Sequence, residues 1–512
     1  MMLTTVVGSL TEAIHVQDLI PEKFQMPVVD WTAVAPATVL IFGAFLLLVI
    51  GSLARHSKWI HGTYVWFTTA TTLVAGFAAW RQWIRIRKGG FTAIADAVNV
   101  DGFTVFVTVV ICSALALAVL VADGYLRRED LEGPEFYVLA MLSASGGIIM
   151  AGANDLVVLF LGLEILSIAL YVLAGSHLRR VESQEAALKY FVLGSFSSAI
   201  FLYGIALVYG ATGSTNLNDI AAYLAENVIL RNGLLSGGLA FLLVGLGFKI
   251  AAVPFHMWTP DVYQGSPSPV TGFMAAAAKA AGFAGLLRLL LTAMNTRSVD
   301  WRPIVWMLAI ASMVVGSILA VVQTDVKRVL AYSSISHSGF ILIGLQAATN
   351  EGMSGSLFYL LTYTFVVLGT FAVVTVVGRR GDGSHDIESY KGLGERAPVL
   401  ALAFTLFLLA QAGIPMTSGF VAKFGVLRAA VDVHSYAIAI VAMLASVISG
   451  YAYLRLMVQM YMHDPVESTP AAGSLVIPIG TRVALVAAAG FTLFAGVAPQ
   501  VLLDFADRAF LR

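Results

Sequence analysis

The stretch "LGFKIAAVPFHMW", residues 246–258, places Lys249 inside an apolar run, and Pro254 follows it by five positions. A lysine at the centre of a membrane helix costs about 2.5–3.5 kcal/mol on insertion scales. A proline removes a backbone hydrogen bond and breaks the helix that contains it. Backbone groups freed at membrane depth persist only where they face protein or water. The stretch therefore predicts a broken membrane helix beside a buried lysine, next to a hydrated path.

Composition places the whole chain in a membrane. Of its 512 residues 59% are apolar and 12% are charged, with a mean hydropathy of +0.86, whereas soluble domains carry about 25% charged residues. Apolar runs long enough to cross a bilayer recur from end to end. We expect an all-α polytopic membrane protein with about 14 transmembrane helices and no soluble domain. The expected spans are 34–54, 61–80, 102–123, 136–153, 155–176, 184–211, 233–258, 267–294, 303–323, 328–348, 353–378, 397–431, 434–460 and 482–503.

The flanking charges predict an orientation. The first 24 residues lack a basic segment before an apolar core, so they do not resemble a cleaved signal peptide. Lys and Arg are more frequent in the loops that face inward if the N-terminus lies outside. By the positive-inside rule, we expect both termini outside a bacterial inner (plasma) membrane.

Charge and cysteine content exclude several functions. The net charge is zero and no long basic tract exists, so nucleic-acid binding is not expected. Cys112 is the one cysteine, which excludes disulfides within the chain and cysteine-ligated iron–sulfur clusters.

The charged side chains inside expected spans include Glu164, Lys189, Lys249, Lys279 and Lys423. The ordinary alternative to a function is snorkelling, in which a long stem carries the charge to the headgroups. Lys249 is roughly 13 Å from the nearer end of its expected span, about twice the reach of a lysine stem. Lys279, Lys423 and Glu164 are also too deep. We expect these four to be buried and functional, with structural pairing as the alternative.

The remaining polar candidates leave alternatives open. Lys189 follows Glu185 by one turn, so a local ion pair explains it as well as a function does. His337, in "AYSSISHSGF", and His256 could each relay protons or make a structural hydrogen bond. A haem held between the two is a further, weaker alternative.

A second proline break repeats the arrangement of the first. The span 397–431 is too long for one straight crossing and contains "AGIPMTSGF", with Pro415, before Lys423. We expect it to be a broken helix like the one at Pro254, with a packing kink as the alternative reading of each proline. Interrupted helices in corresponding positions of two halves point to an inverted-repeat transporter.

Lysine suits a proton carrier in such a place. An ammonium that loses its hydration gives up its proton more easily, whereas a nearby carboxylate favours the charged form. At an effective dielectric of about 20, moving a carboxylate from 4 to 8 Å changes this attraction by about 2 kcal/mol. A modest carboxylate shift could therefore load or unload a proton. Arginine could not serve, because it never deprotonates in proteins.

Three long motifs carry a resemblance to a known family. The segments "FKIAAVPFHMWTPDVYQGSPSPVTGFMAAAAKAAGF" (248–283), "QTDVKRVLAYSSISHSGF" (323–340) and "AGIPMTSGFVAKF" (412–424) resemble the antiporter-like subunits of proton-pumping NADH:quinone oxidoreductase, respiratory complex I. The segment "MWTPDVYQGSPSPVTGF" is most similar to the sequence of its N subunit. The resemblance covers essentially the whole chain.

The resemblance implies a fold and a function. It implies 14 helices with two inverted five-helix repeats, whose helices 7 and 12 are broken. We divide the chain into residues 1–135 (N-terminal segment and helices 1–3), 136–294 and 303–460 (the repeats) and 461–512 (the C-terminal helix). The family's proton-transfer residues match Glu164, Lys189, Lys249, Lys279, His337 and Lys423, and this match favours a function for Lys189. The implied function is proton translocation coupled to quinone reduction elsewhere in the complex.

The resemblance also implies cofactors and partners. No cofactor is expected in this chain, while FMN and iron–sulfur clusters are expected in partner subunits. The expected partners are the M subunit, the small K and J subunits, lipids and the quinone that the complex reduces. Alternatives that stay open are a stand-alone cation/proton antiporter, a passive membrane scaffold and a quinone pocket at "PFHMW".

Overall fold

The computed structural model describes residues 29–53, 58–227, 233–383, 385–465 and 475–511. The first half of the chain forms α2 (Ala35–Leu53), α3 (Lys58–Arg85), η2 (Ile86–Lys88), β1 (Phe91–Ala93), β2 (Val98–Val100), α4 (Gly102–Arg128), α5 (Glu135–Gly152), α6 (Leu156–Ala174), α7 (Val181–Thr212), α8 (Leu217–Glu226), α9 (Gly233–Lys249), α10 (Trp258–Gly265), α11 (Ser268–Phe273), η3 (Met274–Ala278), α12 (Lys279–Arg288), η4 (Leu289–Ala293) and η5 (Asn295–Arg297). The second half forms α13 (Ser298–Val322), α14 (Val326–Ala347), α15 (Asn350–Val377), η6 (Ile387–Tyr390), α16 (Leu393–Arg396), α17 (Pro398–Ala412), α18 (Ser418–Asp432), α19 (Tyr436–Met462), α20 (Ile479–Val497) and α21 (Gln500–Asp507).

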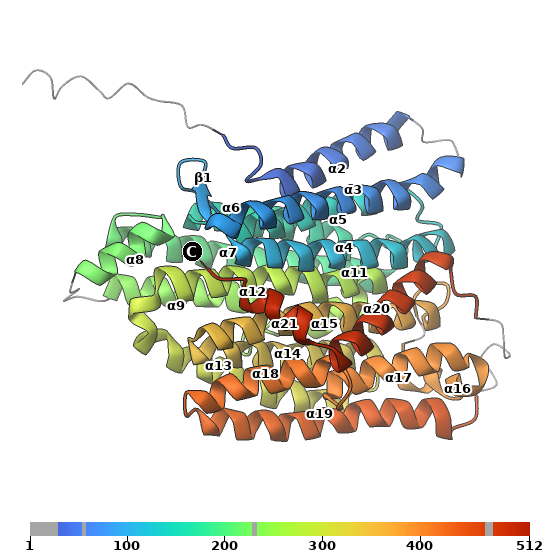
Figure 1. Ribbon diagram of the computed structural model, residues 1–512. Coiled ribbons are helices and arrows are strands. Elements are labelled where there is room, and N and C mark those ends of the chain that lie inside the picture. Colours follow the sequence, from blue (N-terminus) through green and yellow to red (C-terminus); the bar gives the residue numbers. More distant parts are fainter. Residues whose placement is uncertain (1–28, 54–57, 228–232, 384, 466–474, 512) are drawn as a thin grey trace, which may run out of the picture.

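The expected membrane architecture is confirmed. Each of the fourteen expected spans contains one or more helices, and the long helices lie roughly side by side in one bundle (Figure 1). Among the described residues, eleven helices are long and apolar enough to cross a membrane, and α9 and α17 are shorter apolar helices. The antiparallel β1–β2 hairpin and the short helix α8 lie outside the expected spans.

The two proline breaks lie where the sequence predicts them, but the first is wider than expected. Helix α9 ends at Lys249 and α10 begins at Trp258, so the break covers residues 250–257 and begins before Pro254. Lys249 is therefore the last residue of its helix, although its side chain is only 5% exposed. Pro415 lies between α17 and α18. Backbone groups at the first break form hydrogen bonds with protein side chains. Val253 N donates to Ser312 Oγ (2.9 Å), and Trp258 Nε1 donates to Phe248 O (3.0 Å).

The eighth crossing is irregular at its centre. A π-helical segment, η3, ends immediately before Lys279, and a second one, η4, follows α12. Single π turns are rare inside α-helices and occur frequently at functional sites. The irregular turn thus marks the position of the central lysine.

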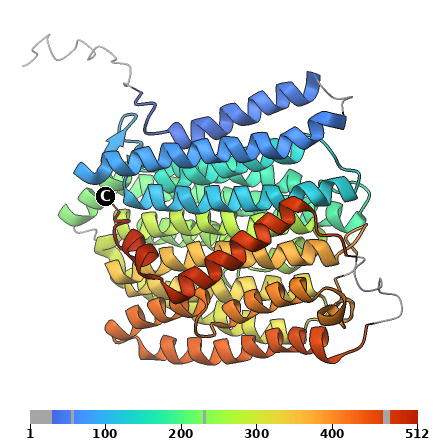
Figure 2. The same ribbon diagram turned by 45° about the vertical axis from the view of Figure 1, so that its right-hand side comes forward.

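The core of the bundle is formed by a few helices. The crossings 268–293, 326–347 and 350–377 are almost wholly buried, with 94% of each apolar window inside the protein, whereas α7 and α20 bury 33%. Helix α15 packs against α4, α14, α18 and α20, and α20 runs obliquely across the outside of the bundle (Figure 2). Close packing also fixes α6 against α5, since a Cβ on Gly146 would lie 2.5 Å from Leu166 N.

The two ends of the bundle differ in character. One end, which we call the basic end, is formed by the loops 129–134, 175–180, 323–325, 378–383 and 385–386 together with the short helices η6 and α16. It carries many of the loop arginines and lysines. The opposite end carries the β1–β2 hairpin, α8 and the C-terminal residues (Figure 1). Because fourteen crossings are an even number, α2 starts at the same end as the one where the described chain finishes.

Candidate functional site

Lys249 lies in a polar niche between α6, α7 and the first helix break. Its Nζ donates to Ser167 Oγ at 2.9 Å and to Tyr190 OH at 3.1 Å. The same nitrogen lies 5.4 Å from the centre of the Tyr190 ring. The Tyr190 ring in turn stacks on Trp258, with centroids 4.6 Å apart and planes 12° apart. The amine is thus held by two hydroxyls and one aromatic face, and no described carboxylate lies within ion-pair distance of it.

Glu164 is in the same region but is only half-buried. It is on α6, one turn before Ser167, and its charge acts on Lys249 without a direct contact. One of its oxygens, Oε1, is buried and has no hydrogen-bond partner among the described residues. A separated carboxylate and ammonium interact through space, and their attraction depends on their distance.

A small cavity adjoins Lys249. It has a volume of about 10 Å³ and is lined by Ser167, Ser197, Ser198, Lys249 and Tyr171 among others. A single water molecule needs about 10–15 Å³ and two to four polar partners. The cavity therefore has the size and the hydroxyl groups to hold one water beside the amine.

Lys279 is the most enclosed of the three deep lysines. Its Nζ donates to Ser334 Oγ at 2.6 Å and to Ser338 Oγ at 2.8 Å, and it lies 5.3 Å from the centre of the Tyr363 ring. Ser338 Oγ donates at 2.6 Å to the carbonyl of Ile250, the residue that follows Lys249. A single serine thus connects the central lysine to the backbone of the first helix break.

His337 lies on α14, three residues after Ser334 and directly before Ser338. Its Nδ1 is 2.7 Å from Tyr359 OH, and its ring centre is 4.9 Å from that of Tyr363. The other ring nitrogen, Nε2, is buried without a hydrogen-bond partner among the described residues. The imidazole is therefore held through Nδ1, while its buried Nε2 has no partner among the described residues.

Lys423 is on α18, and its side chain reaches back to the second helix break. Its Nζ donates at 3.0 Å to the carbonyl of Ala412, the last residue of α17, and at 3.1 Å to Ser446 Oγ. A cation is favourable at a helix C-terminus, where carbonyl groups lack partners. The same nitrogen lies 4.6 Å from the centre of the Phe340 ring. Phe340 also lies beside His337, with ring centres 6.4 Å apart, and stacks with Tyr359.

Lys189 differs from the other candidates, because it is 42% exposed and makes two ion pairs. Its Nζ lies 2.6 Å from Glu185 Oε1, which is the local pair expected from the sequence, and 2.8 Å from Asp261 Oδ2 on α10. The other oxygen of Asp261 lies 2.8 Å from Arg328 Nη1 on α14. The side chain thus belongs to a chain of charges that joins three helices.

A polar pocket at the basic end reaches this charge chain. Its volume is about 680 Å³, and its walls include Lys189, Asp261, Arg180, Asp382 and His385. The pocket is open to the outside of the bundle, so water can reach Lys189 from the basic end.

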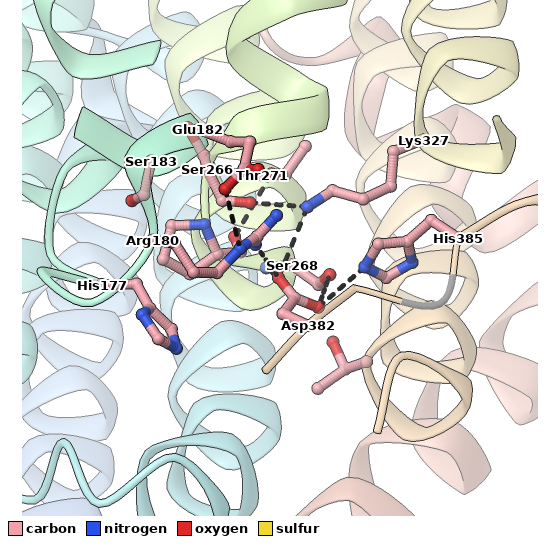
Figure 3. A network of polar contacts seen from close by, with 12 residues as sticks. His177, Arg180, Glu182, Ser183, Ser266, Ser268, Thr271, Lys327, Asp382 and His385 are labelled. Atoms are coloured by element: carbon pink, nitrogen blue, oxygen red, sulfur yellow. Dashed lines mark hydrogen bonds and ion pairs between the residues drawn. The ribbon is translucent and has the colours of Figure 1, made fainter. Parts of the chain in front are cut away.

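The rim of the pocket is held by the buried carboxylate of Asp382 (Figure 3). It contacts Arg180 Nη1 at 3.1 Å, His385 Nε2 at 2.8 Å and Lys327 Nζ at 3.5 Å. Ser268 Oγ also donates to it at 2.9 Å. Burial alone would raise the pKa of the Asp382 carboxyl, but Lys327, His385 and Arg180 together hold that pKa well below its usual value.

Two further polar residues of the bundle, Arg288 and His256, differ in their burial and in their hydrogen bonds. Arg288 is fully buried and fully paired, with two hydrogen bonds to the Asp101 carboxylate at 2.9 and 3.0 Å and a third to Ala151 O, so its role is structural. His256 lies in the first helix break, half-buried, and its Nδ1 has no hydrogen-bond partner among the described residues.

Sequence reasoning missed the hydroxyl and carboxyl groups that hold the predicted lysines. Tyr190, Ser334, Ser338 and Tyr363 all contact or adjoin these amines. Polar residues four apart on an apolar helix, such as Ser334 and Ser338, share one face and could have been found by that spacing. Asp261 carried no such signal, because its partners come from two distant helices.

The comparisons with known proteins agree with this geometry. Residues 153–449 match the family "NADH:quinone oxidoreductase/Mrp antiporter, TM". The chain is 42% identical to the NADH-quinone oxidoreductase subunit N of Trichlorobacter lovleyi, covering 94% of this chain and 97% of that one. It is 38% identical to subunit N of Mycobacterium tuberculosis, over 94% and 98% of the two chains.

Solved structures have the same fold. A chain of respiratory complex I from Thermus thermophilus with bound aureothin is 33% identical, with a TM-score of 0.76 over 92% of this chain and 99% of that one. A chain of the Mrp complex from Dietzia, 22% identical, has a TM-score of 0.81 over 93% and 96% of the two chains and shows the fold alone.

The bundle with two broken helices and buried lysines thus defines an antiporter-like membrane subunit. The chain belongs to the NADH:quinone oxidoreductase/Mrp antiporter family and, within it, to the NADH-quinone oxidoreductase subunit N proteins.

Proposed function

We propose that this chain is a proton-translocating membrane subunit of a multi-subunit NADH:quinone oxidoreductase, driven by electron transfer in other subunits. The proton path runs from Lys249 past Lys279 and His337 to Lys423, with Glu164 acting on Lys249. The observation that carries this proposal is the burial of three lysines, each held by hydroxyls or carbonyls and with no ion-paired carboxylate among the described residues.

The groups between the lysines support the order of the path. The Ser338 hydroxyl accepts from Lys279 and donates to Ile250 O, beside Lys249. His337 lies on the same helix, α14, as this serine, and its Nε2 is open to a partner such as water. Lys423 follows, with its side chain at the second break. A proton relay needs groups that both accept and donate, and hydroxyls, imidazole and water all do so.

The energy scale is compatible with the task. Moving one charge against 100 mV needs about 2.3 kcal/mol. A carboxylate that moves from 4 to 8 Å from an ammonium changes their attraction by about 2 kcal/mol at an effective dielectric of about 20. Because Oε1 of Glu164 has no hydrogen-bond partner among the described residues, no such bond to this oxygen has to break when the carboxylate moves relative to Lys249.

The rest of the assembly follows from the same proposal. FMN and iron–sulfur clusters belong to partner subunits, and among the described residues no cluster of three or more His, Cys, Asp or Glu could hold a metal ion. The M subunit and the small K and J subunits are the membrane partners. Both termini face outward from a bacterial plasma membrane, and the repeats span residues 136–294 and 303–460.

Substitution of Lys249 or Glu164 by Ala tests the proposal. Each variant should reduce NADH-driven proton pumping by the purified complex in proteoliposomes, while the complex remains assembled in the membrane. The charge of Arg428, 73% exposed, is a matched control, so Arg428→Ala should pump at the normal rate. Normal pumping by Lys249→Ala and Glu164→Ala would refute the role and favour a passive scaffold. Purification of the chain alone, exchanging sodium for protons, would instead favour an antiporter.

A further inference from the structure

The short helix α10 contacts α7 at two neighbouring residues. On α10, Trp258 and Asp261 are three residues apart and so share one face. Asp261 pairs with Lys189 at 2.8 Å, and Trp258 stacks on Tyr190, the next residue of α7, at 4.6 Å between ring centres. The two contacts together fix both the position of α10 and its rotation against α7.

Each contact has a different environment. Asp261 is 40% exposed on the wall of the polar pocket, while Trp258 and Tyr190 are buried. Arg328 of α14 holds the second oxygen of Asp261 at 2.8 Å and also donates to Gln264 Oε1 at 3.0 Å. Helix α10, with only eight residues between two breaks, has few hydrogen bonds of its own to keep it in place.

The buried contact leads to the reacting amine. Tyr190 OH accepts a hydrogen bond from Lys249 Nζ at 3.1 Å. The indole of Trp258 also donates to Phe248 O, the carbonyl beside Lys249, at 3.0 Å. A displacement of α10 would therefore move both the hydroxyl on the amine and the end of the helix that carries it.

We propose that Asp261 is a positioning residue for proton transfer at Lys249: its ion pairs with Lys189 and Arg328 fix α10, and α10 in turn holds the Tyr190 hydroxyl on the Lys249 ammonium through Trp258. This inference rests on the proposed function. It assigns Asp261 no proton of its own to carry.

The test compares Asp261→Asn, Asp261→Glu and Tyr190→Phe in the purified complex. Pumping in proteoliposomes is normalised to the assembled complex, measured by NADH oxidation with a water-soluble acceptor. Asp261→Asn should lower pumping about threefold or more, as expected for coupled residues in one network. Asp261→Glu should restore much of it, because the longer carboxylate can still reach both cations. Asp300→Asn is the matched control, since Asp300 is 46% exposed and pairs with Arg297 at 2.7 Å; its pumping should be unchanged.

The double variant Asp261→Asn/Tyr190→Phe separates positioning from general damage. Because Asp261 acts through Tyr190, the double variant should pump no more slowly than Tyr190→Phe. The inference would be overturned if the double variant lowered pumping by the product of the two single-variant factors. Wild-type pumping by Asp261→Asn, or pumping by Asp261→Glu no higher than by Asp261→Asn, would also overturn it.

Assembly and the status of the proposed function are checked separately. If Asp261→Asn does not assemble, Arg328→Gln removes one of the two ion pairs instead; it should lower pumping in the same direction, and normal pumping would overturn the inference. If Lys249→Ala stops pumping while Asp261→Asn does not lower it, the inference alone fails. If Lys249→Ala pumps normally, the proposed function itself fails.

Discussion

The carboxylate of Asp382 lies 3.5 Å from the ammonium of Lys327, and neither side chain is exposed to solvent. Asp382 comes from the loop between α15 and η6, whereas Lys327 is the second residue of α14. Arg180, at the start of α7, completes the cluster at 3.1 Å. One carboxylate thus ties together loops and helices from both halves of the chain at the basic end.

Removal of the Asp382 charge should destabilise this end of the protein. Asp382→Asn leaves the buried Lys327 without its ion-pair partner and removes one of the two carboxylates that pair with Arg180. Breaking a buried pair in this way costs about 3–5 kcal/mol. We expect less assembled complex and a lower midpoint of thermal inactivation. Asp432→Asn is the control, because Asp432 is 56% exposed and pairs with Arg428 at 3.7 Å, an interaction worth about 0–1 kcal/mol. Equal midpoints for the two variants would contradict the structural role of Asp382.

The stabilising effect of Asp382 should depend on pH only under acidic conditions. The pKa of this carboxyl is well below its usual value in the folded protein, while in the unfolded chain it is about 3.9. The Asp382 carboxylate therefore contributes its full stabilisation at pH values above its pKa in the unfolded chain. This contribution is lost as the pH falls through its pKa in the folded protein. The difference in thermal midpoint between wild type and Asp382→Asn should be constant from about pH 8 to 5 and shrink below about pH 4. A difference that shrinks as pH rises from 5 to 8 would contradict the assignment.

A methyl group at Gly413 should impair Lys423. Gly413 has φ +87°, and a Cβ there would lie 2.8 Å from Lys423 Cδ, so Gly413→Ala both strains the backbone and displaces the lysine. We expect NADH-driven pumping to fall as it does in Lys423→Ala. Gly213→Ala is a matched control, with φ +79° and nothing within 4 Å of its Cβ. It carries the backbone cost of about 1–2 kcal/mol without touching a lysine and should pump normally. Equal pumping by both glycine variants would count against the position of Lys423 in the path.

Removal of the Tyr359 hydroxyl should slow proton transfer at His337. The hydroxyl lies 2.7 Å from His337 Nδ1 and orients the imidazole. Tyr359→Phe keeps the ring but frees the imidazole to rotate, so the pumping rate should fall by about two- to tenfold, the effect of losing one hydrogen bond of about 0.5–1.5 kcal/mol. Tyr461→Phe, at an exposed tyrosine on α19, is the control. A normal rate in Tyr359→Phe would show that the orientation of His337 does not limit transfer.

Much of the fold could be predicted because the bilayer constrains it strongly. Apolar runs of about 20 residues must be helices, since only helices satisfy their own backbone in lipid. The breaks at Pro254 and Pro415 were equally predictable. The width of the first break was not, because α10 is an eight-residue helix held by Asp261 and Trp258 rather than by its own composition.

The sequence by itself determined the class of protein, the number of crossings and the burial of Lys249, Lys279 and Lys423, because hydropathy and the cost of a charge in lipid depend on local composition. Only the tertiary structure decided what those lysines contact. Ser338 links Lys279 to the first break, Asp261 joins Lys189 to Arg328, and Asp382 lies between Arg180 and Lys327. These contacts join residues from different helices across the bundle, and such long-range pairings follow from how the helices pack rather than from any local pattern.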